Sequence, residues 1–133
     1  MLPFEFFVVA TPVSSQARNR KKRRDWGAEI RARALEAWDP NHSPFSEPIR
    51  VQIGYYFRGG SLDVDNILKA ILDGMKDVVY TDDNLVTDLA VKKRSLDGFL
   101  RMDMSVGFAC ALETGADFVH VLVDRADEIE VLK

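Results

Sequence analysis

The sequence is short of cysteine, of histidine and of long apolar runs. Its 133 residues contain one cysteine and two histidines. One cysteine cannot form an internal disulfide, which suits a reducing compartment. No apolar window approaches the roughly 18 residues that a membrane-spanning helix needs. The apolar segment at residues 4–10 is too short for a secretory leader and carries an acid. We therefore expect a cytoplasmic protein with no membrane partner.

The chain also lacks an excess of basic residues. Its formal net charge is −3, which does not mark a nucleic-acid binder. The distribution of charge is more informative than the sum. Residues 18–33 hold eight basic and two acidic side chains, whereas residues 113–133 hold six acidic and two basic ones. An acidic C-terminal segment can therefore hide a basic binding face in the total.

Hydrophobic periodicity predicts strands alternating with helices. A four-residue repeat from Trp26 to Trp38 predicts one amphipathic helix, and a second is expected from about residue 65 to 77. The expected strands are 4–10, 51–57, 85–93 and 100–108, with a fifth at 118–123. We expect one α/β (α+β) domain over residues 1–133. Its mixed sheet would have four to five strands, with two main helices packed on it.

Three smaller features follow from the same patterns. Asp97-Gly98 is typical of a hairpin turn before the strand at 100–108. Cys110 lies in an apolar run, which predicts a packed core thiol and not a nucleophile. Residues 124–133 are expected to form a short helix or to fray.

Two aspartates mark a strand-to-helix transition. In an extended segment, side chains two residues apart point the same way, so Asp63 and Asp65 can face one ion. The helix dipole favours their ionised form. Ionised oxygen ligands suit a hard cation such as Mg²⁺, and the absence of nearby His or Cys argues against zinc. The alternative is that one aspartate only caps the helix.

Further charged residues could complete this site. Lys69 lies one turn beyond Asp65, where a cation can stabilise charge on a reacting phosphate. The alternative is an exposed ion pair between Lys69 and Asp73. Asp82 and Asp83 precede the strand at 85–93 and could close the metal site from the other side. The alternative for this pair is an ordinary turn.

The joint spacing of these residues resembles the RusA family of Holliday-junction resolvases. The matching pattern comprises Asp63, Asp65, Asn66, Lys69, Asp73, Tyr80, Asp82 and Asp83. The resemblance implies a homodimeric nuclease that depends on Mg²⁺, with Mn²⁺ as a substitute, and cuts four-way DNA junctions. It further implies that Asp63, Asp65 and Asp83 are the essential acids and metal ligands, that Lys69 is the essential lysine, and that Asp82 is at most a supporting residue.

The chain departs from the family pattern in three places. Before Asp63 it has only Arg58 where the family tends to be basic. The family's N-terminal Pro-x-Ser is followed by Asn, which is missing after Pro12-Val13-Ser14. Residues 115–133 have no recognised counterpart and are interpreted as a family-atypical acidic extension.

Two basic segments are candidates for contact with branched DNA. The first precedes the predicted helix, and the second lies near the hairpin. The alternative for each is a solvated charge run, whereas a nuclease needs such cations because its substrate is a polyanion. The predicted DNA-binding residues are Arg20, Lys21, Lys22, Arg23, Arg24, Arg58, Lys92 and Lys93.

The function that these observations favour is an endodeoxyribonuclease that resolves four-way junctions during recombination and repair. Two other classes fit some of the residues. One is a metal-dependent phosphatase or nucleotide hydrolase that uses the same carboxylates. The other is a DNA-structure-binding protein without turnover.

Overall fold

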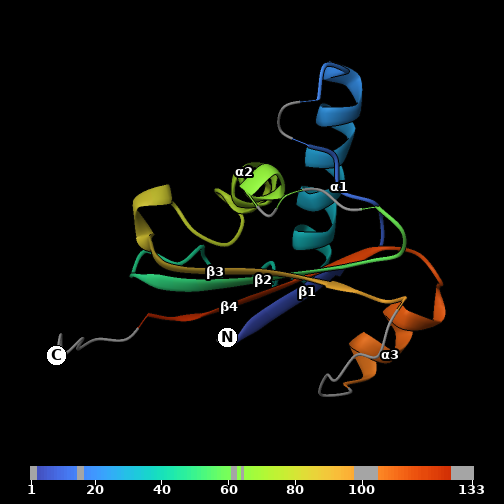
Figure 1. Cartoon of the computed structure of the whole chain (residues 1–133). Coiled ribbons are helices and arrows are strands. Elements are labelled where there is room, and N and C mark those ends of the chain that lie inside the picture. The colour runs from blue at the N-terminus through green and yellow to red at the C-terminus, as the bar shows by residue number, and fades with distance from the viewer. Residues whose placement is uncertain (1–2, 15–16, 61–62, 64, 98–104, 127–133) are drawn as a thin grey trace, which may run out of the picture.

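A four-stranded mixed sheet with helices on both faces forms the fold (Figure 1). It is seen in a computed structural model that describes residues 3–14, 17–60, 63, 65–97 and 105–126, the side chains of Asp65 and Asn66 excepted. The strands are β1 (Phe4–Val8), β2 (Ile49–Phe57), β3 (Val86–Ser95) and β4 (Phe118–Arg125), in the spatial order β1-β4-β2-β3. The predicted α/β class is confirmed.

Strand β4 occupies an inner position although it comes last in the chain. It pairs antiparallel with β1 on one side and with β2 on the other, whereas β2 and β3 are parallel. The weakest of the predicted strands, at 118–123, is therefore central to the sheet. Residues of the acidic C-terminal segment thus belong to the core of the domain.

Two helices cover one face of the sheet. Figure 1 shows α1 (Arg20–Ala37) and α2 (Asp65–Met75) on the same side. Alternate strand residues point toward them and join the main core, among them Phe6, Ile53 and Val121. The predicted four-residue repeat is confirmed, because its members Trp26, Ile30, Ala34 and Trp38 are all buried.

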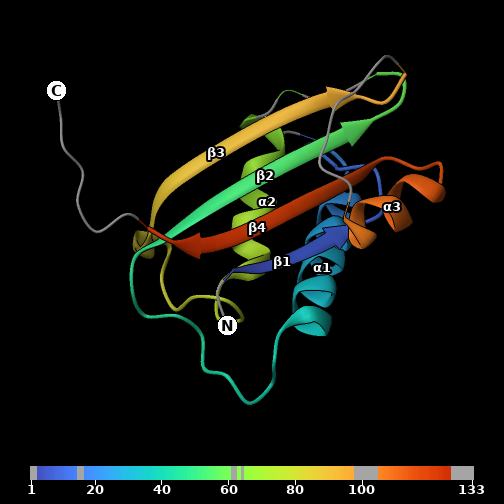
Figure 2. The same ribbon diagram turned by 90° about the horizontal axis from the view of Figure 1, so that it is seen from below.

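The opposite face carries a short helix at one end. Figure 2 shows α3 (Val106–Glu113) in front of the sheet there. Phe108 from α3 packs against the rings of Phe7, Tyr56 and Phe118, which alternate with the residues of the main core. The sheet therefore has an apolar surface on both faces at this end.

The strand predicted at 100–108 is wrong for its last three residues. They lie at the start of α3, where the Ser105 side chain accepts a hydrogen bond from the Phe108 amide at 3.3 Å. This N-cap, with Phe108 and Ala111 on the packed side, favours a helix over the alternating pattern. Gly98 of the predicted turn and residues 99–104 lie outside the described residues.

Cys110 is also placed differently from its prediction. It lies on the exposed side of α3 and is a free thiol at the surface. The apolar run around it is helical, so only every third or fourth residue reaches the sheet. In the described part of the chain, no helix combines the length and apolar character needed to cross a lipid bilayer.

Helices α1 and α2 approach each other closely at Gly74. A Cβ atom added there would lie 2.7 Å from Cγ2 of Ile30, which is itself fully buried. Beside this crossing, the Arg31 guanidinium donates to the carbonyl oxygens of Asp73 and Lys76 at 3.4 and 3.1 Å. The crossing therefore sets the position of α2, which begins at the predicted site.

Replacing this glycine tests the crossing directly. Gly74→Ala should lower the free energy of unfolding by roughly 1–3 kcal/mol, because overpacking outweighs the better helix propensity of alanine. Gly27→Ala is the matched control, since a Cβ on this α1 glycine meets nothing within 4 Å. It should stabilise by roughly 0.5–1 kcal/mol. Urea unfolding of both variants checks this, and a stable Gly74→Ala protein would contradict the close crossing.

Candidate functional site

Of the two predicted acids at the start of α2, one precedes the helix and the other is its first residue. Asp63 is exposed, and the helix begins at Asp65. The Asp65 side chain lies outside the described residues, so its predicted pairing with Asp63 stays a prediction. Lys69 is exposed one turn further along. The expected alternative, an ion pair between Lys69 and Asp73, is not among the salt bridges of the described residues.

Two carboxylates hold the backbone between β2 and Asp63. Asp117 Oδ1 accepts a hydrogen bond from the Arg58 amide at 2.8 Å, and Asp97 Oδ2 accepts one from the Gly59 amide at 2.7 Å. The Tyr55 hydroxyl also donates to Asp117 Oδ2 at 3.3 Å. Burial, followed by the charge of Asp117, raises the pKa of Tyr55 to about 12, so this donor stays protonated at neutral pH. The chain therefore leaves β2 in a defined direction.

The second pair of acids lies in a short 3₁₀ turn, η1 (Asp83–Leu85). Asp82 caps this turn, because its Oδ1 accepts a hydrogen bond from the Asn84 amide at 3.1 Å. The strand begins only at Val86, so Asp83 lies in the turn and not in the strand. Both acids are exposed. What distinguishes them is that Asp82 is engaged in the cap.

Tyr80 links this turn to α2. Its ring is fully buried, and its hydroxyl donates to the Leu72 carbonyl oxygen at 2.5 Å. Burial raises the pKa of Tyr80, and the negative charges of Asp83 and Asp73 raise it further. Asp83 is therefore close enough to the Tyr80 hydroxyl for its negative charge to affect the pKa of that group. The sequence identified the aromatic residue of the pattern, and the structure adds its role as a tie between η1 and α2.

The described acids do not by themselves form a metal site. Among the described residues, no three His, Cys, Asp or Glu side chains are grouped to hold an ion. The predicted triad includes Asp65, whose side chain lies outside those residues, so the triad is not tested as a whole. The chemistry of the set fits a hard cation, because all of its donors are carboxylate oxygens and Asp63 and Asp83 are solvent-accessible.

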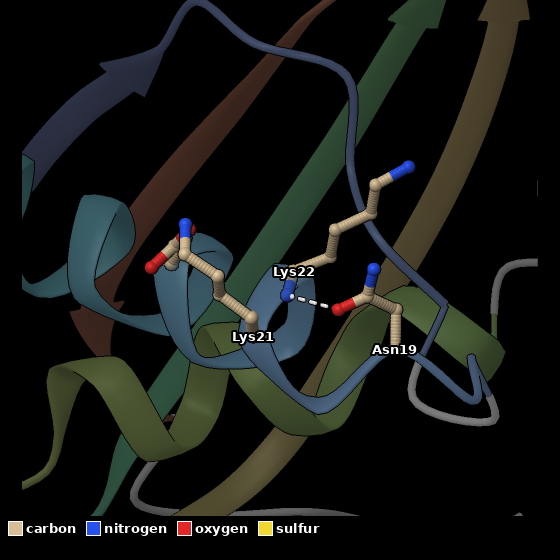
Figure 3. Close-up of polar contacts among 4 residues, drawn as sticks. Asn19, Lys21 and Lys22 are labelled. Carbon is tan, nitrogen blue, oxygen red and sulfur yellow. Dashed lines mark hydrogen bonds and ion pairs between the residues drawn. The ribbon is translucent and has the colours of Figure 1, made fainter.

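The basic run belongs to α1, and the expectation that it precedes the helix is wrong. Asn19 is the N-cap, and its side chain accepts a hydrogen bond from the Lys22 amide at 3.1 Å (Figure 3). Figure 3 also shows the Lys21 and Lys22 side chains leaving the helix in different directions. Lys21 pairs with Asp25 at 3.0 Å, and both side chains are largely exposed to solvent, so the pair stabilises little. Helical geometry therefore distributes the basic side chains of this run around the axis of α1.

One member of this run, Arg23, lies beside the predicted catalytic lysine. A pocket between α1 and α2 is lined by Arg23 and Trp26 on one side and by Lys69, Ala70 and Asp73 on the other, with Val13 and Ser14. Arg23 also lines a second hollow with Arg20 and Arg24. Trp26 was predicted only as a core residue, because its spacing gives no hint that its edge reaches a pocket.

The other predicted DNA contacts are divided between the two faces of the sheet. Lys93 is opposite Tyr55 in β2 and shares its side with α1 and α2, whereas Lys92 is opposite Gly54. His120 is also paired with Gly54, and Lys92 helps to lower the pKa of His120 after the larger effect of burial. Lys92 therefore faces α3. Arg58 is exposed beside Asp117, and contact of all three with DNA stays a prediction.

Comparison with known protein families connects these features. Residues 9–99 match the model of the RusA endodeoxyribonucleases, which is most of the chain. The chain belongs to the RusA family. A search of curated proteins gave no match. Family membership carries endodeoxyribonuclease activity as the general class of function.

The RusA match ends before two structural elements. Helix α3 and strand β4 follow residue 99. Strand β4 nevertheless pairs with two strands of the matched region, and Asp117 at its start holds the loop that leads to Asp63. The part of the chain beyond the match is therefore required for the sheet that carries the candidate site.

Removal of the Asp117 carboxylate should loosen one amide of this loop. In Asp117→Ala, hydrogen exchange at the Arg58 amide should accelerate by roughly tenfold, as for the loss of one hydrogen bond to a charged group. The Gly59 amide, held by Asp97, is the internal control and should keep most of its protection. Exchange measured by NMR checks this, and equal protection of Arg58 in both proteins would show that Asp117 does not hold the loop.

Proposed function

We propose that the protein is a Mg²⁺-dependent endodeoxyribonuclease that resolves four-way DNA junctions by paired nicks during recombination and repair. The observation that carries this proposal is the family match over residues 9–99, which contains every predicted catalytic residue. Asp63 before α2 and Asp83 in η1 are both exposed, and Lys69 lies between them in the chain. These positions agree with the proposal.

The proposed metal ligands are Asp63, Asp65 and Asp83. Bound there, Mg²⁺, or Mn²⁺ in its place, would polarise the scissile phosphate and promote ionisation of an attacking water. Asp63 sits where the anchored loop meets α2, and Asp83 sits in a turn tied to α2 through Tyr80. Asp82 supports the turn through its cap.

Lys69 is the proposed stabiliser of charge on the reacting phosphate. Its ammonium is exposed and forms no salt bridge with another described residue. An ammonium that is not neutralised by a partner can interact with a phosphate oxygen as negative charge develops. It also lines the pocket with Arg23, which connects the reacting centre to the basic start of α1.

DNA recognition is proposed to depend on the backbone and the shape of the junction. The candidate DNA-binding residues are arginines and lysines on α1, on β3 and at Arg58, which suit phosphates better than base edges. A four-way junction is close to two-fold symmetric and needs two matched nicks. Each chain is proposed to supply one catalytic site, so we propose a two-fold homodimer as the active form.

Two alternatives are separated by simple assays. A metal-dependent phosphatase or nucleotide hydrolase would turn over mononucleotides and leave a synthetic junction intact. A DNA-structure-binding protein would bind the junction with and without Mg²⁺ and never cut it. The proposed function requires cleavage of the junction that appears with Mg²⁺ and disappears with a chelator.

The adjacent acids of η1 offer a matched pair of variants. Asp83→Asn should reduce junction cleavage by more than the roughly 10- to 100-fold that is typical for loss of a supporting residue. Asp82→Asn should retain measurable activity, because an asparagine oxygen still accepts the Asn84 amide. Initial rates at saturating Mg²⁺ check this. An inactive Asp82→Asn protein beside an active Asp83→Asn protein would reverse the two roles.

The basic start of α1 should determine how binding depends on salt. Neutralising Lys21, Lys22, Arg23 and Arg24 together should weaken junction binding and lower the log–log salt slope by roughly one for each DNA phosphate that these side chains neutralise. Arg33→Gln with Arg125→Gln is the control, since both arginines pair with surface glutamates. Binding titrations at several salt concentrations check this, and an unchanged slope in the fourfold variant would exclude binding of DNA by this segment.

A further inference from the structure

The pocket between α1 and α2 is lined by two residues that each have a buried N–H without an acceptor. Trp26 is only 4% exposed, and its indole nitrogen has no hydrogen-bond partner among the described residues. The same holds for Nε of Arg23, which lines the pocket beside it. Buried donors of this kind are rare in folded proteins and point to a ligand or a bound solvent molecule.

Other side chains of the same types show what is unusual here. The second tryptophan, Trp38, donates from its indole nitrogen to the His42 carbonyl oxygen at 2.8 Å. Arg33 and Arg50 also have a buried Nε, but each of their guanidiniums pairs with a carboxylate. No such pair involving Arg23 is found among the described residues. No carboxylate of a described residue therefore neutralises the charge of Arg23.

The charge and size of the pocket select a small anion. Lys69 and Arg23 bring two positive charges and Asp73 one negative, so the described residues of the lining are net positive. The cavity of about 160 Å³ is smaller than the roughly 300–1,000 Å³ of a site for a drug-sized ligand. A phosphate group offers several acceptor oxygens to the guanidinium, ammonium and indole donors at once.

We propose that this pocket binds one phosphate of the DNA backbone, held by the Trp26 indole N–H, Arg23 and Lys69. Its assignment to a DNA phosphate rests on the proposed nuclease function. Arg23 also lines the neighbouring hollow with Arg20 and Arg24, so the basic surface continues away from the pocket as a polyanion requires. Trp26 and Arg23 are then positioning residues, which hold the strand relative to the acids at the start of α2.

The two tryptophans make a direct test possible. In the metal-free, ¹⁵N-labelled protein, inorganic phosphate should shift the indole N–H resonance of Trp26 and leave that of Trp38 in place, because Trp38 already has its acceptor. Sodium chloride at matched ionic strength should move neither resonance. An unmoved Trp26 signal, or equal movement of both, would overturn the proposal.

Two variants on α1 separate binding in the pocket from a general effect of positive charge. Arg23→Gln should weaken phosphate binding on the order of tenfold, as expected for loss of a hydrogen bond to a charged group. Arg33→Gln removes the same charge from an α1 residue outside the pocket, whose guanidinium pairs with Glu29 and Glu36, and should leave binding within about twofold. Equal weakening by both variants would contradict a built site.

A third variant addresses positioning in the reaction. Trp26→Phe keeps the aromatic ring and removes the donor, so KM for junction cleavage should rise more than kcat falls. A fall in kcat alone would exclude this role, and the Arg23→Gln titration decides the question if the variant fails to fold. A protein that binds phosphate here but never cuts DNA would refute the nuclease proposal and leave the anion pocket standing. A protein that cuts DNA but does not bind phosphate here would refute only the proposed anion pocket.

Discussion

The ladder that β4 forms with both of its neighbours is the interaction on which the rest of the structure depends. It is the only link between β1 and β2 in the described sheet, so the N-terminal strand belongs to the sheet only through a strand formed more than a hundred residues later. The faces of these strands carry the core that receives α1 and α2. The residue immediately before β4 is Asp117, which holds the backbone at Arg58. Sheet order and loop geometry are therefore consequences of one strand.

The candidate site combines rigid support with exposed chemistry. Its charged groups, Asp63, Lys69 and Asp83, are exposed. The segments that carry them are held in place by contacts with the rest of the domain. Gly74 lets α1 approach α2, Tyr80 ties η1 to α2, and Asp117 holds the loop before Asp63. Such an arrangement allows acids and a lysine to meet a polyanion in solvent without losing their relative positions. The basic first turns of α1 then lie beside Lys69 at the shared pocket.

Much of this arrangement could be predicted from local patterns. The four-residue repeat of Trp26, Ile30, Ala34 and Trp38 marked the packed side of α1, and the order of charged residues between Asp63 and Asp83 indicated the RusA family that the family match confirms. The errors occurred where local signals compete. At residues 106–108 the alternating pattern favoured a strand, whereas the Ser105 cap and the contacts of Phe108 favour the observed helix. At residues 20–24 the run of charge favoured a segment before the helix, whereas the Asn19 cap begins the helix ahead of that run.

By itself, the sequence determined which segments become helices or strands over most of the chain, and it determined the family, because both are encoded in the spacing of nearby side chains. The tertiary structure decided the inner position of β4, the capping role of Asp82, the anchoring role of Asp117 and the place of Trp26 in the lining of a pocket. Most of these depend on which distant segments meet. Strand order and helix crossing are selected by the packing of the whole core. No short stretch of sequence contains both Asp117 and Arg58, or both Trp26 and Lys69, so these contacts cannot be predicted from local patterns.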